Sequence, residues 1–254
     1  MQIIGIPSAL GSLVGKGCSK APSAIIEKLN FIHSQHNTLL PQYKKLEINP
    51  ANLEETFDLI EKTVKNSPKG TIFLGGDHSV TYPIIKAFAN PDTAFVIFDA
   101  HPDCVQYFNP PSQEDFINVL ISDEIISSNQ IFLVGNRNIY PDEKKFIQEK
   151  KIRVYNMDKI FDLGIQPVMD ALTEQLMKFK TIYVSLDIDC VDPVFAPGVD
   201  YPEPGGFNSR ELIYIINRLT KLKQFSYLDI VEVNPEKDNG QTVLLVAKLI
   251  AGLC

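Results

Sequence analysis

The chain has 254 residues, of which 44% are hydrophobic, and this is enough apolar material for one domain with a sizeable buried core. Its formal net charge is -7 and its pI about 5.2, so it lacks the basic surface that binds nucleic acids or anionic membranes. No apolar run reaches the length of a membrane span, and residues 1–7 lack the features of a signal peptide. The four cysteines have no paired spacing, which indicates free thiols and a cytoplasmic protein.

Apolar runs typical of buried strands alternate with helical patterns along the whole chain. We expect strands at residues 2–6, 45–48, 71–74, 94–98, 130–134, 153–155, 181–186 and 225–231. We expect helices at residues 22–29, 53–65, 80–89, 114–121, 142–149, 168–179, 209–219 and 243–253. Pro22 suits a first helical turn, and Ser209 is a plausible N-cap. This alternation predicts either an open doubly wound sheet or a closed (β/α)8 barrel, and the pattern alone does not separate them.

Two long loops interrupt the alternation. Residues 7–21 contain several glycines and Lys16 but lack the GxxxxGK[ST] spacing of a phosphate-binding loop, which argues against nucleotide binding. Residues 192–206 are rich in proline and directly follow a predicted strand. Because proline restricts the backbone, this second loop can form the rim of a site at little entropic cost.

Ionisable side chains follow three of the predicted strands. They are His78 after the third strand, Asp99, His101 and Asp103 after the fourth, and Asp187 and Asp189 after the seventh. Residues two apart in an extended chain point to the same face, so each set can converge on one point. Each motif alone is common in turns and helix caps. All of them, however, lie at the carboxyl ends of apolar strands, where α/β folds gather their sites.

Cations are needed to explain this concentration of charge. Four carboxylates at the ends of buried strands would repel one another, and each would cost several kcal/mol of desolvation unless cations neutralised them. The six side chains therefore predict a metal site built from two imidazoles and four carboxylates. A set of nitrogen and oxygen ligands without thiolate suits manganese or a similar divalent ion better than structural zinc.

The motifs, in this order, resemble those of the ureohydrolase family, which comprises arginases, agmatinases, formimidoylglutamases and their relatives. The matching segments are residues 75–79, 99–103, 185–189, 192–198 and 231–235. Within them, Asp-x-Asp-x-x-Asp-Pro-x-x-Ala-Pro-Gly, at residues 187–198, is highly specific. The resemblance spans nearly the whole chain, and it indicates a divergent member of the family. It implies a three-layer α/β/α fold with an open, mainly parallel eight-stranded sheet, formed by residues 1–254 as a single ureohydrolase-like domain.

The resemblance also implies two manganese ions per chain. His78 and Asp103 would bind one ion, His101 and Asp189 the other, and Asp99 and Asp187 would bridge both. A hydroxide held between the ions stays deprotonated near neutral pH, since metal binding lowers the pKa of water to about 7. In the family mechanism this hydroxide attacks the central carbon of a guanidinium or formimino group and releases urea or formamide. Asp187 or its neighbour would manage the proton.

Two acidic residues near the end of the last predicted strand are candidates for substrate binding. Glu232 matches the carboxylate that orients the cationic amidine in the family, and Asp229 lies nearby on the same strand. For Glu232 the alternative is a buried carboxylate that supports histidine or backbone groups. The family resemblance further implies a small-molecule amidine as substrate and a homo-oligomer, commonly a trimer or hexamer.

The chain departs from the arginase pattern around the expected cavity. Arginases and agmatinases carry a His-Gly shortly after Asp-x-His-x-Asp, whereas residues 104–116 contain no histidine. Val105 replaces an Asn and Tyr140 replaces an Asp, both of which contact the amino-acid end of arginine in arginases. A missing acceptor for a buried ammonium costs ~1–3 kcal/mol or more. L-Arginine is therefore expected to be a poor substrate.

Other polar residues near this segment have open assignments. Glu114 or Asp115 could hold a cationic tail if their loop folds over the site, although both also suit the start of a helix. His33 and His36, the remaining histidines, are expected on a solvated surface near the end of the first helix.

Two hypotheses from different classes follow. The first is a binuclear metal hydrolase of a linear amidine. The second is a metal-binding family member with little or no catalysis, which acts as a binding or regulatory protein. The six intact ligands favour the first, because a protein without chemistry has little reason to retain so costly a charge cluster, whereas the altered segment 104–116 favours the second or an unusual substrate. A deacetylase on a related scaffold fits less well, given Glu232 and the complete second motif.

Overall fold

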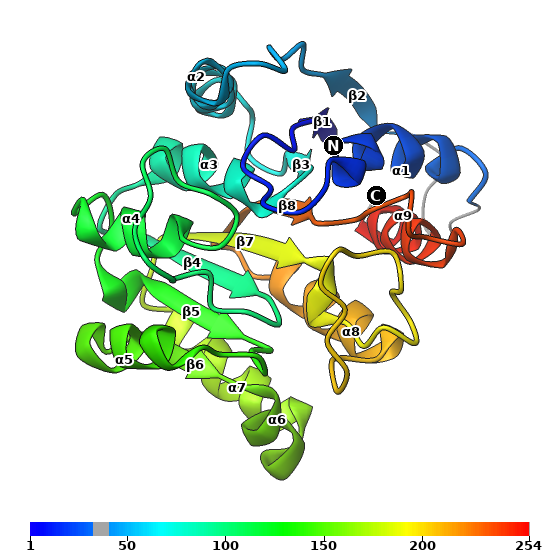
Figure 1. Ribbon diagram of the computed structural model, residues 1–254. Coiled ribbons are helices and arrows are strands. Elements are labelled where there is room, and N and C mark those ends of the chain that lie inside the picture. The colour runs from blue at the N-terminus through cyan, green and yellow to red at the C-terminus, as the bar shows by residue number, and fades with distance from the viewer. Residues whose placement is uncertain (33–40, 254) are drawn as a thin grey trace.

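Eight strands form one sheet within residues 1–32 and 41–253, which are the residues that the computed structural model describes (Figure 1). The strand order is β2-β1-β3-β8-β7-β4-β5-β6, and every neighbouring pair is parallel. The strands are β1 (Gln2–Gly5), β2 (Gln42–Lys45), β3 (Ile72–Leu74), β4 (Thr93–Phe98), β5 (Ile131–Val134), β6 (Arg153–Tyr155), β7 (Thr181–Asp187) and β8 (Phe225–Val231). The edge strands β2 and β6 do not pair with each other, so the predicted open sheet is confirmed and the barrel is excluded.

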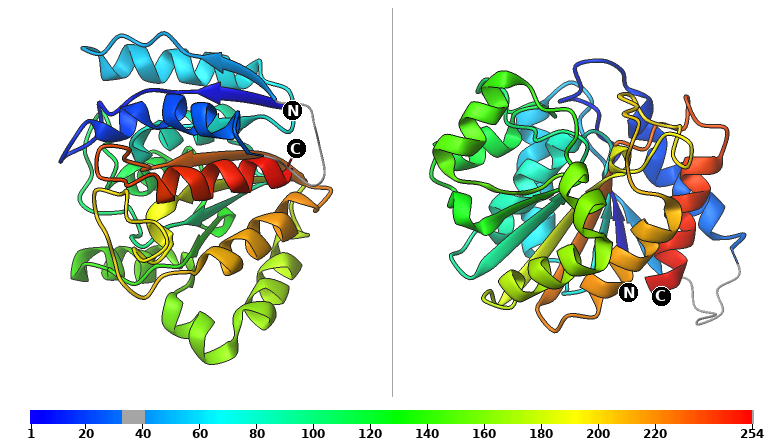
Figure 2. Two further views of the ribbon diagram at one scale, coloured as in Figure 1. Left: turned by 90° about the vertical axis from the view of Figure 1, so that its right-hand side faces the viewer. Right: turned by 90° about the horizontal axis from the view of Figure 1, so that it is seen from below.

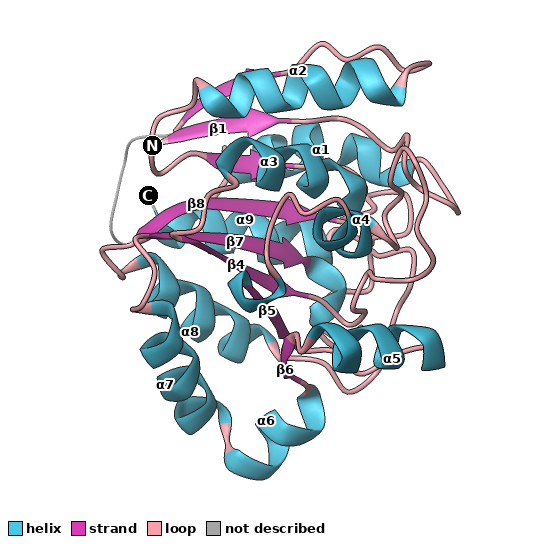
Figure 3. Cartoon of the chain, turned by 90° about the vertical axis from the view of Figure 1, so that its left-hand side faces the viewer, coloured by secondary structure: helices cyan, strands magenta, loops and turns pink. Residues whose placement is uncertain are grey.

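Helices cover both faces of this sheet, and the layers are visible in Figures 2 and 3. One layer contains α1 (Ala21–Leu29), α6 (Met157–Leu163), α7 (Ile165–Leu176), α8 (Ser209–Thr220) and α9 (Gln241–Leu253). The other contains α2 (Leu53–Lys65), α3 (Thr81–Phe88), α4 (Phe116–Ser122) and α5 (Pro141–Lys150). Short 3-10 turns occur at η1 (Gly17–Lys20), η2 (His78–Val80), η3 (Ser128–Gln130) and η4 (Ile188–Cys190). The three-layer α/β/α architecture is therefore confirmed.

The strand β4 shows how the sheet separates two apolar cores. All of its residues are buried. Phe95 and Ile97 pack in the core on the side of α2 to α5, whereas Val96 and Phe98 pack in the core on the side of α7 to α9. Because successive side chains of a strand point to opposite faces, a strand covered on both sides must be apolar throughout. This requirement explains the continuous apolar runs in the sequence.

The edge strand β2 is displaced from its predicted range. The sequence predicts a strand at residues 45–48, because Leu46 and Ile48 are apolar, but the strand is Gln42–Lys45. Among the described residues it pairs with β1 alone, and the pairing ends where β1 ends, with Gly5 opposite Lys45. Leu46 is buried just after the strand. The length of the partner strand, and not the position of the apolar residues, sets the bounds of β2.

Two helix boundaries also differ from prediction. Asn208, not Ser209, is the N-cap of α8: its side chain accepts the N–H of Glu211, whose carboxylate accepts the N–H of Asn208, both at 2.9 Å. Asn and Ser suit this position about equally, so sequence alone leaves the two neighbours open. The single helix predicted at 168–179 is α7, which begins earlier. It is separated from the unpredicted α6 by Gly164, whose φ is +82°.

The fold bears on several other expectations. No helix among the described residues is long and apolar enough to cross a membrane. Pro22 lies in the first turn of α1, as predicted. Cys18, Cys104 and Cys190 are buried and free, in agreement with unpaired thiols. Cys254, His33 and His36 lie outside the described residues.

Candidate metal centre

The carboxyl ends of three strands, β3, β7 and β4, bring the predicted ligands to one edge of the sheet, and β8 between β3 and β7 brings Glu232 to the same edge. Figure 3 shows β8, β7 and β4 side by side. His78 lies in η2 after β3, Asp187 ends β7, Asp189 lies in η4, and Asp99, His101 and Asp103 occupy the loop after β4. Parallel strands present all their carboxyl ends at the same edge, and sites of α/β proteins form there. All six side chains therefore converge, as the sequence predicts.

His78 lies at the centre of a first group of candidate ligands. Its Nδ1 is 2.8 Å from Asp103 Oδ2, 3.0 Å from Asp99 Oδ2 and 3.3 Å from Asp187 Oδ2. The imidazole is buried, yet neither His78 Nδ1 nor Asp99 Oδ2 has a hydrogen-bond partner. Buried polar atoms without partners are rare in folded proteins. These atoms therefore fit the binding of a cation between them.

His101 is the centre of a second group. Its Nδ1 is 3.0 Å from Asp189 Oδ2 and 3.4 Å from Asp99 Oδ1. Asp99 thus faces His78 with one oxygen and His101 with the other, the placement that a bridging ligand needs. Two groups of three residues each bring one candidate ligand atom per residue within 4.8 Å of the others. These groups are His78, Asp99 and Asp187, and Asp99, His101 and Asp189. Nitrogen and oxygen donors of this kind suit manganese.

Backbone N–H groups hold three of the carboxylates in place. His101 N–H donates to Asp99 Oδ1 at 2.6 Å, Asp189 N–H donates to Asp187 Oδ1 at 2.8 Å, and Ala100 N–H donates to Asp189 Oδ1 at 3.0 Å. Each carboxylate is fixed through Oδ1, while its Oδ2 faces an imidazole. The ligand oxygens are therefore oriented before any ion binds.

A buried chain of hydrogen bonds orients His78 from behind. Its Nε2 lies 3.1 Å from Ser185 Oγ, which donates to Asp229 Oδ1 at 2.6 Å. Because the Ser185 proton is committed to Asp229, the serine oxygen accepts from Nε2–H of His78. In the neutral imidazole this bond places the proton on Nε2 and leaves Nδ1 unprotonated, which is the form that binds metal.

Asp229 has a different place from the one expected of a substrate-binding residue. It is fully buried and does not line the cavity over the ligand cluster. Thr81 and Tyr183 donate to its Oδ2, in addition to the bond from Ser185 to Oδ1, so both of its oxygens are occupied. Its place on β8 directs the side chain beneath His78 and not into the cavity. Asp229 is therefore positioned to support His78, which corrects the expectation of substrate contact.

The pKa values show how strongly negative charge accumulates at the site. Burial lowers the pKa of His78, but its contacts with Asp103, Asp187 and Asp99 prevail and raise that pKa well above the ordinary value. Burial and the neighbouring Asp99 raise the pKa of Asp103 well above its usual range. Protons on these groups offset part of the carboxylate charge. Divalent ions would displace the protons and offset the charge more fully.

Glu232 follows β8 and lies beside His78. Its Oε1 accepts the backbone N–H of His78 at 2.6 Å, and its side chain lines the cavity. Burial and the nearby Asp77 raise its pKa well above the usual range. The backbone φ is +62° at Glu232 and +50° at Asp103, a left-handed conformation that is uncommon outside glycine. Strained backbone of this kind is concentrated at functional sites.

A cavity opens over the ligand cluster. Its floor contains His78, His101, Asp103, Asp187, Asp189 and Glu232, and its walls contain Val105, Gln113, Glu114, Asn138, Tyr140, Glu143, Val199, Asp200 and Tyr201. The two residues expected to alter substrate specificity, Val105 and Tyr140, are therefore both in the wall. Apart from the two histidines, no cationic side chain belongs to this lining, so the charged wall residues are all acidic.

The two acids before α4 differ in position. Glu114 lines the cavity and accepts a hydrogen bond from Tyr201 Oη at 3.1 Å. Asp115 is buried away from it and accepts the backbone N–H groups of Ser112 and Phe108, both at 2.6 Å. Of the two residues expected to hold a cationic tail, only Glu114 faces the cavity. Both precede the helix, which begins at Phe116.

Sequence reasoning missed two contributions to the site. The guanidinium of Arg137 donates to the carbonyl groups of Asp189 and Glu203, at 2.7 and 2.6 Å, and so ties the proline-rich loop to the ligand cluster. The segment Gly-x-Arg that ends at Arg137 was a weak signal for this role. Asp200 lies in the wall, but in the sequence nothing separates it from a solvated carboxylate in a loop.

The arginase family model matches residues 1–254, and individual relatives agree with it. The formimidoylglutamase of Halalkalibacterium halodurans is 31% identical over 258 residues, which cover 93% of this chain and 80% of that relative. Arginase 1, mitochondrial, of Arabidopsis thaliana is 29% identical, and the match covers 76% of this chain but only 57% of the relative. The structure of formimidoylglutamase from Bacillus subtilis shares the fold, with a TM-score of 0.91 at 23% identity over 99% of this chain and 85% of that one. Together with the motifs and the ligand geometry, these matches place the chain in the arginase family.

Proposed function

We propose that this protein is a manganese-dependent hydrolase of a linear amidine, with a binuclear metal centre. Its product would be urea from a guanidino compound or formamide from a formimino compound. The observation that carries the proposal is the position of Asp99, which faces His78 and His101 with different oxygens and so relates two groups of ligands. Relatives named as arginase and as formimidoylglutamase support both kinds of substrate.

Each ligand has a defined place in this proposal. His78 and Asp103 would hold one ion, His101 and Asp189 the other, and Asp99 and Asp187 both. When bound, two such ions supply a water whose pKa is lowered to about 7 and which can act as the nucleophile. Ser185 and Asp229 keep the His78 imidazole in the required tautomer.

Residues of the cavity would bind and orient the amidine. Glu232 presents a buried carboxylate beside His78 and would accept N–H groups of the cationic head. Asp187 lines the same cavity and, besides helping to hold the ions, would manage the proton of the hydrolysis. Tyr201 and Glu114 are hydrogen-bonded in the wall and face the tail of the substrate.

The alternative of a metal-binding protein without catalysis has one feature in its favour, which is the absence of histidine in residues 104–116. The cavity argues against it, because five of the six candidate ligands line a space that also contains Glu232. A site that only stored or sensed metal would not need this access. We therefore infer that the altered wall changes the substrate and leaves the hydrolysis in place.

The decisive experiment measures metal content and product release together. Protein dialysed against manganese should retain close to two ions per chain. It should also release urea or formamide from at least one compound among arginine, agmatine, guanidinobutyrate and formiminoglutamate. Arginine should be a poor substrate, because Val105 and Tyr140 offer no carboxamide or carboxylate to its amino-acid end. Retained metal without turnover of any compound would favour the alternative, and absence of retained metal would refute the site.

Two further expectations concern the whole molecule and rest on the family likeness. We infer that the protein is cytoplasmic and forms a homo-oligomer. Light scattering in solution would test the second inference, and a mass near 28.5 kDa at working concentration would contradict it.

A further inference from the structure

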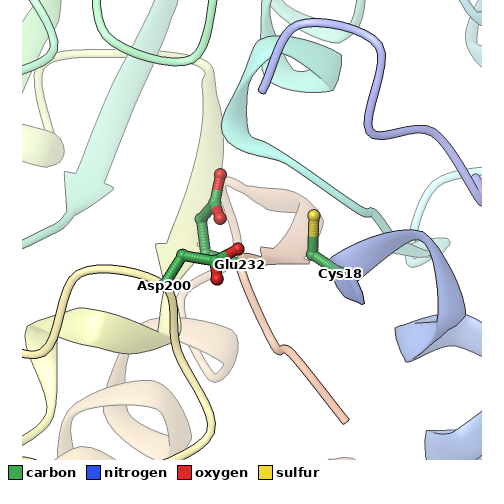
Figure 4. A group of neighbouring side chains, drawn as sticks. All are labelled: Cys18, Asp200 and Glu232. Atoms are coloured by element: carbon green, nitrogen blue, oxygen red, sulfur yellow. The ribbon is translucent and has the colours of Figure 1, made fainter. Parts of the chain in front are cut away.

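Three side chains from distant parts of the chain lie near one another (Figure 4). Cys18 comes from η1, Asp200 from the proline-rich loop, and Glu232 from the end of β8. One candidate ligand atom from each lies within 4.8 Å of the other two. Asp200 and Glu232 line the cavity that contains the predicted metal ligands. The proposed function assigns a task to Glu232 but none to Asp200.

One oxygen of the Asp200 carboxylate has partners, and the other has none. Its Oδ1 accepts the side-chain amide of Asn234 at 2.8 Å and lies 2.8 Å from Lys237 Nζ. Its Oδ2 is buried and has no hydrogen-bond partner, and the side chain as a whole is only 2% exposed. A buried carboxylate oxygen without a donor is costly. The arrangement holds Oδ2 ready for a donor that the described residues do not supply.

Glu232 repeats this arrangement next to Asp200. One of its oxygens accepts the backbone N–H of His78, and the side chain faces the cavity. Cys18 adds no charge, because burial, followed by the fields of Glu232 and Asp77, holds the pKa of its thiol well above the ordinary value. Lys237 is paired with Asp200, whereas Glu232 has no cationic partner among the described residues. A cation bound between the two carboxylates would favour the ionised form of Glu232.

We propose that Asp200 and Glu232 together bind the cationic head of the amidine, with Asp200 as the second carboxylate of that head site. An amidinium supplies a positive charge and has N–H donors on more than one edge. An NH2 group that donates to two oxygens at ~2.9 Å each can join oxygens up to about 5 Å apart. One oxygen of Asp200 lies within 4.8 Å of one oxygen of Glu232, which is inside this reach. This assignment rests on the proposed function, and it makes Asp200 a residue that recognises the reacting end of the substrate.

This assignment gives different parts of the cavity different roles in substrate recognition. Asp200 should act on every amidine in the same way, because all share the cationic head. Glu114 faces the cavity from another segment and should act only through the tail. A comparison of the two acids therefore separates recognition of the head from recognition of the tail.

The first test compares Asp200→Asn with Glu114→Gln as the matched control. Asp200→Asn keeps the shape of the side chain but removes its charge. We expect the KM of every active amidine to rise by about 10- to 100-fold, the loss of a charged hydrogen bond, with manganese content as in the parent protein. Glu114→Gln should change KM for some tails and not for others. If Asp200→Asn leaves KM unchanged, or changes it for one tail only, the assignment is wrong.

The second test needs no turnover. Guanidinium, at concentrations below those that unfold the protein, and urea, its neutral analogue, are titrated calorimetrically into the manganese-loaded protein. The parent protein should bind guanidinium at least ten times more tightly than urea, and Asp200→Asn should lower that preference because only Glu232 then remains to bind the cation. If guanidinium binds in this way but no amidine is hydrolysed, the head site is supported and the proposed reaction is refuted. Equal binding of the two probes would overturn the head site.

The same three side chains could instead bind a thiophilic metal ion, and a third experiment distinguishes this outcome. Titration with Cd2+ would then produce the ultraviolet absorption of a cadmium thiolate, and Cys18→Ser would abolish the absorption. Cys104→Ser serves as the control, since Cys104 is also buried and free. Such a band, lost only in Cys18→Ser, would overturn the assignment of Asp200 to the amidine. Its absence is the expected result.

Discussion

The floor and the walls of the cavity are built on different principles. The floor is formed at the ends of four adjacent strands, where backbone N–H groups fix three of the carboxylates, and every ligand except His101 is almost fully buried. Apart from Glu143 in α5, the walls come from loops, and some of their side chains are well exposed, such as that of Tyr140 at 57%. The sheet therefore determines which chemistry is possible, whereas the loops determine which substrate reaches it.

The largest effect should come from a change in the floor at the residue that both metal groups share. Asp99→Asn removes a negative charge that faces His78 and His101. We expect the loss of at least one manganese ion and a fall in kcat/KM greater than the ~10–100-fold typical of residues that only support a ligand. Elemental analysis and steady-state kinetics measure the two effects.

A matched change away from the floor gives the control for Asp99→Asn. Asp170→Asn alters an exposed carboxylate on α7 that pairs with Arg218. It should leave metal content and kcat/KM unchanged, because an exposed ion pair contributes little. If Asp99→Asn retained two ions and normal activity, the claim that the floor residues determine metal binding and catalysis would be wrong.

The second prediction concerns the support beneath the floor. Ser185→Ala breaks the link between His78 Nε2 and Asp229, so the imidazole loses the partner that fixes its tautomer. We expect manganese affinity to fall by about 10- to 100-fold, while the overall fold is preserved. Competition with a metal indicator measures the affinity. Unchanged affinity would show that the floor does not depend on this buried chain.

The floor was predictable from the sequence because its geometry is local. Asp99, His101 and Asp103 lie at alternate positions after an apolar strand, which drew attention to them. The backbone that brings them together is not the expected extended chain, because they lie in the loop after β4, Asp103 has a φ of +50°, and Asp189 lies in the 3-10 turn η4. Only the meeting of separate strands at one edge required knowledge of α/β folds. The fold class followed from the same alternation of strands and helices. The open sheet did not follow from the pattern, and it came from the family resemblance.

The walls were less predictable because their contacts join residues far apart in the chain. Nothing near Asp200 in the sequence indicates that Asn234 and Lys237 fix its carboxylate. Asp229 shows the opposite difficulty. Its place on a strand was predicted correctly, but which face of the sheet its side chain supports depends on Ser185 and Tyr183 from the neighbouring strand. The proximity of Asp229 to Glu232 in the sequence therefore led to the incorrect expectation that Asp229 contacts the substrate.

The third prediction uses metal removal to measure how strongly the floor is coupled to folding. Ions that bind only the folded state stabilise it by mass action, by about 2.7 kcal/mol at a hundred times the dissociation constant. Chelation should therefore lower the Tm, and added manganese should restore it. Calorimetry with verified metal content checks this result. An unchanged Tm after complete removal would count against a tightly coupled site.

The smallest predicted effect lies behind the wall, at Asp115. Its Oδ2 accepts the backbone N–H of Phe108 and its Oδ1 that of Ser112, both at 2.6 Å. An asparagine side chain has only one oxygen, so it can accept only one of these two hydrogen bonds. Asp115→Asn should therefore lower the free energy of unfolding by about 1–3 kcal/mol, with metal content unchanged. Urea denaturation measures this loss, and Asp92→Asn, at an exposed carboxylate, is the control.

The pH dependence of the same variant sharpens the test. Burial is the main reason that the pKa of Asp115 is raised in the folded protein. Between the ordinary pKa of an aspartate and this raised value, the folded state binds more protons than the unfolded state. The contribution of Asp115 to stability therefore decreases as pH rises through that interval. Asp115→Asn cannot titrate, so the decrease should be absent from its stability profile, and a profile parallel to that of the parent protein would contradict the assignment. Either result concerns only the segment behind the wall, because the floor ligands do not contact this carboxylate directly.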